Sequence, residues 1–106
     1  MDTNHQILSD LKNYLLLHLG EEIKDVILFG SRITTDYTVD SDYDVLIIVN
    51  RSYDNKYEET VYNLCYDLDL KYDILIDPHI LSTSELKTLR GKQPIFINAI
   101  NKGLHA

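Results

Sequence analysis

A run of five apolar residues at positions 45–49 constrains the fold more than any other part of the chain. It reads Val-Leu-Ile-Ile-Val, and its β-branched residues favour a buried strand. Residues 26–29 (Val-Ile-Leu-Phe) and 74–76 (Ile-Leu-Ile) are shorter runs of the same kind, the second closed by Pro78. We therefore expect three strands.

Helical spacing of apolar residues lies between and beside these runs. It predicts helices over residues 4–19 and 54–70. Ser82 and Glu85 have the spacing of a capping box and predict a short helix. Pro94 suits a first helical position, and Gly103 suits a helix end. Strands interleaved with helices indicate a small α/β domain.

The composition excludes several classes of function. The 106 residues fit one domain, 1–106, and the formal net charge of −7 disfavours nucleic acid as a partner. No run of about 18 apolar residues is present to span a membrane, and the N-terminal residues lack the pattern of a signal peptide. Cys65 is the single cysteine, so an internal disulfide is excluded. These features favour the cytoplasm.

Carboxylates gather at the entry of the strongest strand. Asp42 and Asp44 are two residues apart, so both side chains leave one face of the strand. Asp73 is expected to begin the next strand and to reach the same end of the sheet. Such carboxylates repel one another unless a divalent cation neutralises them, and all-oxygen ligation suits Mg²⁺ or Mn²⁺. Two ions about 4 Å apart can clamp a phosphoryl transfer.

Two alternatives to this metal site stay open. Asp-Tyr-Asp on its own is also compatible with a polar strand edge, and Asp77 has the same strand parity as Asp73. Because Asp77 precedes Pro78, we expect it to serve as a cap or in a turn, and not as the third carboxylate. His79 follows Pro78 and is a further candidate for the site.

Gly30 and Ser31 directly follow the first strand. Glycine lets the backbone approach a ligand closely, and serine adds a hydroxyl donor. Backbone N–H groups at such a turn can bind a phosphate. Arg32 is expected either to contact that phosphate or to form an ion pair with a neighbouring aspartate.

The combination resembles a known family. Residues 28–32 (Leu-Phe-Gly-Ser-Arg) and 40–49, which open with Asp-Ser-Asp-Tyr-Asp, are similar to the minimal nucleotidyltransferases of the DNA polymerase β-like superfamily. The resemblance extends through residues 72–76 and 94–103. It implies the polymerase β-like fold, a small mixed sheet flanked by helices.

The resemblance also implies roles for individual residues. Gly30 and Ser31 would hold nucleotide phosphates, Asp42 and Asp44 would bind two Mg²⁺ ions, and Asp73 would bind the catalytic ion and help to deprotonate the acceptor. The chain departs from the usual Gly-Ser-Arg-Ala-Arg-Gly loop, having Ile-Thr-Thr at positions 33–35. That departure puts substrate choice and rate in doubt more than the chemistry.

Minimal members are often antitoxins, which implies transfer of AMP from ATP to a tyrosine of a partner HEPN-domain toxin. The small size favours an acceptor site that a second protein completes. One alternative is an aminoglycoside-type small-molecule nucleotidyltransferase, which would need a second subunit such as another copy of the chain. Another alternative is an antitoxin that neutralises its partner by binding alone.

Overall fold

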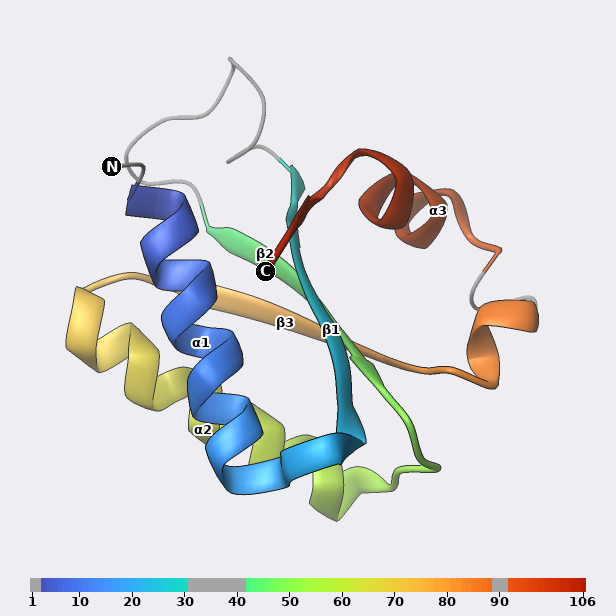
Figure 1. Ribbon diagram of the computed structural model, residues 1–106, viewed down its shortest axis with the longest axis horizontal. Helices are drawn as coiled ribbons and strands as arrows, with labels where there is room; N and C mark the ends of the chain where they lie inside the picture. Colours follow the sequence, from blue (N-terminus) through green and yellow to red (C-terminus); the bar gives the residue numbers. More distant parts are fainter. Residues whose placement is uncertain (1–2, 31–41, 89–91) are drawn as a thin grey trace.

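The computed structural model describes residues 3–30, 42–88 and 92–106 (Figure 1). The elements are α1 (Thr3–Leu19), η1 (Gly20–Glu22), β1 (Ile23–Phe29), β2 (Tyr43–Val49), α2 (Asn55–Tyr72), β3 (Ile76–Ser82), η3 (Glu85–Lys87), α3 (Pro94–Lys102) and β4 (Leu104–His105). Among the helices of the described residues, none combines the length and apolar character that a membrane crossing needs.

Four strands form one mixed sheet in the order β3-β2-β1-β4. β1 runs antiparallel to both β2 and β4, whereas β2 and β3 are parallel. Antiparallel β1 and β2 are consecutive strands, and α2 provides the crossover that parallel strands require. The expected α/β fold with a small mixed sheet is thereby confirmed.

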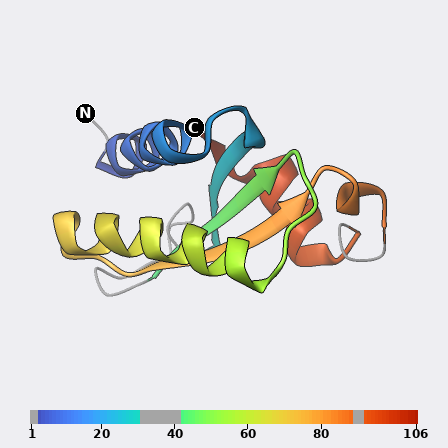
Figure 2. The same cartoon turned by 90° about the horizontal axis from the view of Figure 1, so that it is seen from below.

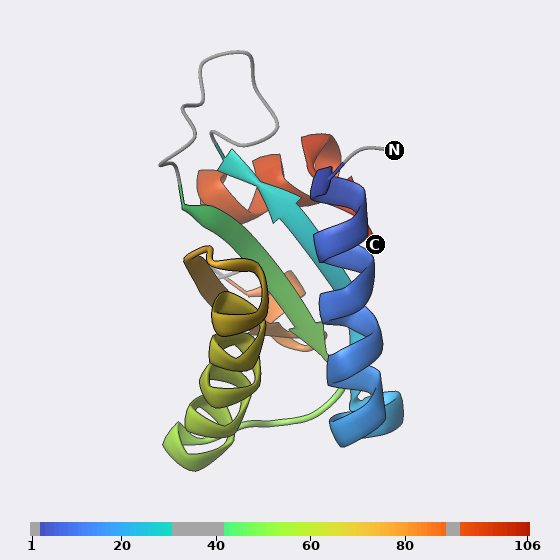
Figure 3. The ribbon, with the colours of Figure 1, turned by 90° about the vertical axis from the view of Figure 1, so that its left-hand side faces the viewer.

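Helices α1 and α2 lie together on one face of the sheet, and α3 lies on the other (Figures 2 and 3). The face under α1 and α2 holds the larger core. That core contains Ile7, Leu8, Leu11, Leu15, Ile23, Val26, Leu28, Tyr43, Val45, Ile47, Val49, Tyr57, Val61, Leu64, Cys65, Leu68, Ile76 and Ile80. Burial raises the pKa of the Cys65 thiol to about 12, so this cysteine is a neutral packing residue.

The opposite face holds a smaller core. It contains Ile27, Phe29, Leu46, Ile48, Leu81, Phe96 and Ala99. Helix α3 begins with Pro94 as its first residue and ends before Gly103. A side chain at Gly103 would overlap Ile27 and the carbonyl of Ala99, so the end of α3 packs directly against β1.

Side-chain caps fix several element boundaries. Asp54 accepts a hydrogen bond from the Tyr57 backbone N–H at 2.9 Å and thereby begins α2. The expected capping box is present, because Glu85 accepts from the Ser82 backbone N–H at 3.0 Å and the Glu85 backbone N–H donates to the Ser82 hydroxyl at 3.2 Å. The helix that follows is one short 3₁₀ turn, η3, whose N-cap residue is Ser84 and not Ser82.

The third strand differs from its prediction. β3 begins at Ile76 and continues through Pro78 to Ser82, whereas the apolar run predicted a strand at 74–76 that ended before the proline. The β3 strand lies at the edge of the sheet, where proline's missing N–H removes no ladder hydrogen bond on the outer side. The prediction also omitted β4, which is only two residues long.

Candidate active site

Strand register brings two carboxylates together at one end of the sheet. Asp44 of β2 is the direct partner of Asp77 on β3, and Phe29 is the partner of Asp44 on the other side. Residues paired in this way point to the same face of the sheet. Asp42 precedes Asp44 by two residues and is exposed immediately before β2.

The electrostatics of Asp44 reflect this crowding. Burial raises the pKa of the Asp44 carboxyl, and repulsion from the carboxylates of Asp77 and Asp42 raises the pKa further, whereas His79 lowers it. Asp44 and Asp77 also share a side-chain hydrogen bond that favours the protonated form. A divalent cation would relieve this repulsion, because it stabilises both ionised carboxylates.

Gly30 follows the last residue of β1, and its backbone lies close to the side chain of Asp44. Its φ is +79°, in the left-handed region that favours glycine. A Cβ atom at this position would overlap the carboxylate of Asp44. The glycine therefore permits both the turn of the chain and the close approach of its backbone to Asp44.

A cleft of about 560 Å³ opens over these groups. Residues of the strands and of the turn after β1 form one wall, and they include Gly30, Asp44, Asp77 and His79. Helix α3 forms the other wall. The lining residues from α3 are Ile95, Asn98, Ala99 and Lys102. The cleft thus combines two carboxylates, an imidazole, an amide and one lysine with an apolar patch.

The structure places the third predicted carboxylate elsewhere. Asp73 does not begin a strand, because α2 continues to Tyr72 and Asp73 forms its C-cap with a φ of +54°. Asp77, expected in a turn, instead lies within β3 beside Asp44. Among the described residues, the group whose ligand atoms could hold one metal ion is Asp44, Asp77 and His79.

Two other predicted site residues, Ser31 and Arg32, lie outside the described residues, as do Ile33, Thr34 and Thr35. The phosphate-binding role of Ser31 and Arg32 stays a prediction. Gly30 alone of the predicted phosphate-binding residues is described, and it lines the cleft.

Sequence analysis did not single out Lys102 or Asn98. The helical spacing of these residues was visible in the sequence, since Ile95, Asn98 and Lys102 are three and four residues apart and share one face of α3. The sequence could not show that this face lies opposite Asp44 and Asp77.

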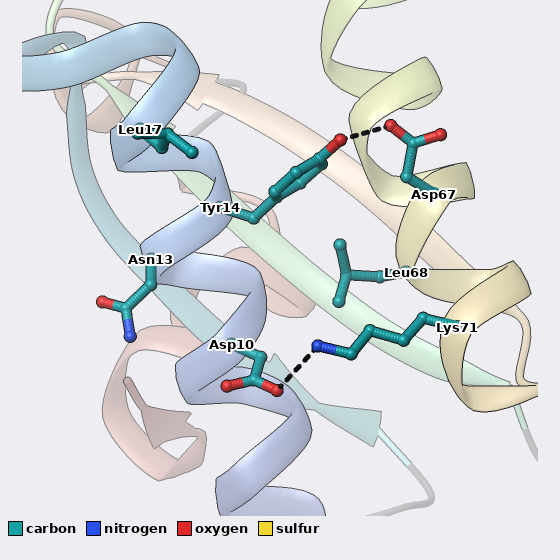
Figure 4. Close-up of a pocket in the computed structure, with 7 residues that line it drawn as sticks. All are labelled: Asp10, Asn13, Tyr14, Leu17, Asp67, Leu68 and Lys71. Carbon is teal, nitrogen blue, oxygen red and sulfur yellow. Dashed lines mark hydrogen bonds and ion pairs between the residues drawn. The ribbon is translucent and has the colours of Figure 1, made fainter.

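A second hollow, of about 420 Å³, lies between α1 and α2 (Figure 4). Its polar groups bind one another across the helix pair. The Tyr14 hydroxyl donates to Asp67 at 2.6 Å, and Lys71 lies 3.6 Å from Asp10. The bond to Asp67 raises the pKa of Tyr14. These pairs stabilise the packing of two helices, and we assign no chemistry to this hollow.

The mixed sheet, the glycine after β1 and the paired carboxylates define a nucleotidyltransferase of the polymerase β-like class. The family model described as Polymerase beta, Nucleotidyltransferase matches residues 9–100. The chain belongs to this family and is a nucleotidyltransferase.

Two similar proteins come from Methanocaldococcus jannaschii. The protein named "Putative protein adenylyltransferase MJ0141" is 36% identical over 83 residues, which cover 78% of this chain and 83% of that protein. The protein named "Putative protein adenylyltransferase MJ0604" is 36% identical over 81 residues, covering 76% and 75% of the two chains. No solved structure matches the chain.

Proposed function

We propose that this chain transfers AMP from ATP to a hydroxyl group of a protein, with divalent cations bound by Asp44 and Asp77. The acceptor oxygen forms a bond to the α-phosphorus of ATP, and pyrophosphate leaves. The observation that carries the proposal is the direct pairing of these two carboxylates on neighbouring strands, at the floor of a cleft that also contains Gly30. Asp77 takes the role that the sequence assigned to Asp73. Asp42 lies near enough to Asp44 to affect its pKa, so it is the third candidate ligand.

The residues of the cleft fit this chemistry. Bound Mg²⁺ ions, two by resemblance to the family, would neutralise the nucleotide phosphates and the developing charge. Lys102 supplies a cation that can hold a phosphate oxygen, and the backbone at Gly30 can approach a phosphate closely. The Asp77 side chain is 54% exposed, so an acceptor hydroxyl can reach this carboxylate and give up its proton there.

The choice of a protein acceptor rests on two observations. Both similar proteins carry the name "Putative protein adenylyltransferase". The formal net charge of −7 opposes a nucleic-acid acceptor. A tyrosine of a HEPN-domain toxin is the acceptor that the resemblance to minimal nucleotidyltransferases implies.

The test is transfer of label from α-³²P-ATP in Mg²⁺, with a bacterial protein extract, a HEPN-domain protein and kanamycin offered separately as acceptors. We expect label on protein, released by phosphodiesterase. The Asp44→Asn variant should lower transfer by at least about 1000-fold, because metal-held charge contributes several kcal/mol. Glu59→Gln, an exposed carboxylate change on α2, is the control and should transfer at the wild-type rate.

Each other result has a definite meaning. Label on kanamycin in place of protein would support the small-molecule alternative. Transfer that persists in the Asp44→Asn variant would contradict the proposed site. An absence of transfer to every acceptor, with a HEPN-domain protein still neutralised by both wild type and variant, would support an antitoxin that acts by binding alone.

A further inference from the structure

His79 lies on the same sheet face as the two carboxylates. It follows Asp77 by two residues on β3, and its register partner is Leu46, two residues after Asp44 on β2. Because side chains on a strand alternate between faces, Asp44, Asp77 and His79 all point toward the side covered by α3. His79 lies two residues further along β3 than Asp77, toward the middle of the strand.

The imidazole ring is packed between aromatic side chains. Its centroid lies 5.5 Å from that of Phe29 and 6.5 Å from that of Phe96. The side chain is 28% exposed, and Nε2 is 3.5 Å from Asp77 Oδ2. The ring is therefore held on its apolar edges while a nitrogen faces the carboxylates.

A hydrogen-bonded ion pair with Asp77 is the simplest alternative, and the distance argues against such a hydrogen bond. Charge-assisted hydrogen bonds of this type are about 2.7–2.9 Å long. The chain has such a pair elsewhere, because His105 Nδ1 lies 2.7 Å from Asp25 Oδ2. The His79 nitrogen is 0.8 Å further from its carboxylate (3.5 against 2.7 Å).

The spacing suits a shared ion. The ligand atoms of Asp44, Asp77 and His79 all lie within 4.8 Å of one another. Two ligands on opposite sides of one ion, each about 2.1 Å from it, are about 4.2 Å apart. Small side-chain rotations are enough to bring the three groups onto one ion.

We propose that His79 is a ligand of a metal ion held with Asp44 and Asp77, and that this position binds a divalent transition metal in preference to Mg²⁺. The inference rests on the proposed function, since it takes both carboxylates as metal ligands. Imidazole nitrogen is a good ligand for transition metals and a poor one for Mg²⁺, which prefers carboxylate, phosphate and water oxygens. The histidine thus determines which ion the carboxylate pair selects.

Mn²⁺ is the probe, because it is the most weakly bound ion of the divalent first-row series, so that any selectivity it shows is a lower bound. Electron paramagnetic resonance measures its binding to the protein without nucleotide, and competition gives the Mg²⁺ affinity. We expect His79→Ala to weaken Mn²⁺ binding at least tenfold, since loss of an outer-shell partner alone costs about 10–100-fold. Mg²⁺ binding should change by less than about threefold.

His18→Ala is the matched control, because His18 is exposed on α1 and its ring contacts Tyr14. This variant should bind Mn²⁺ as the wild type does. A second measurement detects ligation directly. In protein labelled with ¹⁵N-histidine, Zn²⁺ should shift the Nε2 resonance of His79 and leave the resonances of His18 in place.

The sign of the change separates a ligand from a nearby positive charge. If His79 only places a positive charge beside the carboxylates, its removal will strengthen the binding of both Mn²⁺ and Mg²⁺. That result, or unchanged Mn²⁺ affinity in a folded His79→Ala protein, would overturn the inference. The metal-binding assays contain no ATP, so they test the His79 ligand independently of AMP transfer. If Mn²⁺ binding depends on His79 but no AMP transfer is detected, the proposed function is rejected and the assignment of His79 as a metal ligand is retained.

Discussion

The two faces of the sheet differ in the size of the core that they bury and in the groups that they expose. Helices α1 and α2 cover one face with 17 and 18 residues, whereas α3 covers the other with 9 residues. The larger face is a closed apolar core. On the smaller face the apolar cluster reaches Phe29 at the end of β1, and Asp44, Asp77 and His79 line an open cleft beside it.

Strand alternation makes this division possible within one strand. In β2, Tyr43, Val45, Ile47 and Val49 enter the larger core, and Leu46 and Ile48 enter the smaller core. Asp44 shares the parity of these last two. A cleft carboxylate can therefore sit in a strand that is almost entirely buried, since its neighbours along the chain point away from it. The larger core therefore lies on one face of the sheet, and the proposed site lies on the other.

The largest expected effect breaks the chemistry of the smaller face. Asp77→Asn should lower AMP transfer by about 1000-fold, or about 4 kcal/mol in activation free energy, because it removes one carboxylate of the pair. Asp73→Asn is the matched control, since asparagine tolerates the left-handed conformation of that helix cap. Rates of label transfer compare the two. A large loss in Asp73→Asn with full activity in Asp77→Asn would restore the assignment made from sequence.

The next effect breaks the larger face. Leu15 of α1 is fully buried, and Leu15→Ala should lower the free energy of unfolding by about 3 kcal/mol, because it leaves a cavity. The Mn²⁺ affinity of the protein that remains folded should not change. Urea unfolding measures the loss, with Leu17→Ala as the control because Leu17 is 78% exposed. Equal losses in the two variants would contradict the placement of the core.

Gly30→Ala should have an intermediate effect that falls on both stability and activity. The new Cβ would be strained at a φ of +79° and would displace the Asp44 carboxylate, so transfer should fall by about 30-fold, or about 2 kcal/mol. Gly20→Ala is the control, because Gly20 has a φ of +61° but open space around it. It should lose about 1 kcal/mol of stability and keep its activity. Similar activity in both variants would show that only backbone strain matters at Gly30.

The smallest expected effect concerns the hydrogen bonds of His105, which connect helix α3 to strand β1. His105 of β4 bonds the Ile100 carbonyl of α3 at 2.9 Å and Asp25 of β1 at 2.7 Å. The bond to the Ile100 carbonyl, followed by that to Asp25, raises the pKa of His105 above its ordinary value of 6.5. A raised pKa means that protonated His105 stabilises the fold fully below pH 6.5 and loses this contribution as the pH rises through the folded-state pKa.

We therefore expect the stability difference between wild type and His105→Gln to shrink between pH 6 and pH 8.5. The change should be at most about 0.5 kcal/mol, because solvent screens this exposed pair. Chemical denaturation at several pH values measures it. A difference that grows with pH would reverse the sign and contradict the assignment of the two bonds.

Much of the fold could be predicted from local sequence. Apolar periodicity identified α1, α2 and the cores of β1 and β2, because burial of one face dictates those patterns. Pro94 and Gly103 marked α3, and the Ser82–Glu85 spacing marked a real capping box. The two-residue strand β4 was missed, because so short a segment has no period to detect.

The expected position of Asp73 at the start of a strand was wrong, because Asp73 is the C-cap of α2 and β3 begins at Ile76. Asp73 and Asp77 are four residues apart, so strand parity cannot distinguish them. The choice depends on where α2 ends and β3 begins. Asp69 in the last turns of α2 accepts a hydrogen bond from the Ile76 backbone N–H at 2.8 Å, and the Tyr43 N–H donates to the Leu75 carbonyl at 2.8 Å. These contacts set the register that pairs Asp44 with Asp77.

The sequence by itself determined the alternation of strands and helices, the two-residue spacing of Asp42 and Asp44, and the position of Gly30 at a strand end. These are local properties, because they follow from the periods of a strand and a helix. Only the tertiary structure decided that Asp77 and His79 join Asp44, and that Lys102 faces them across a cleft. The physical reason is that the β2–β3 register and the packing of α3 depend on contacts between residues distant in the chain.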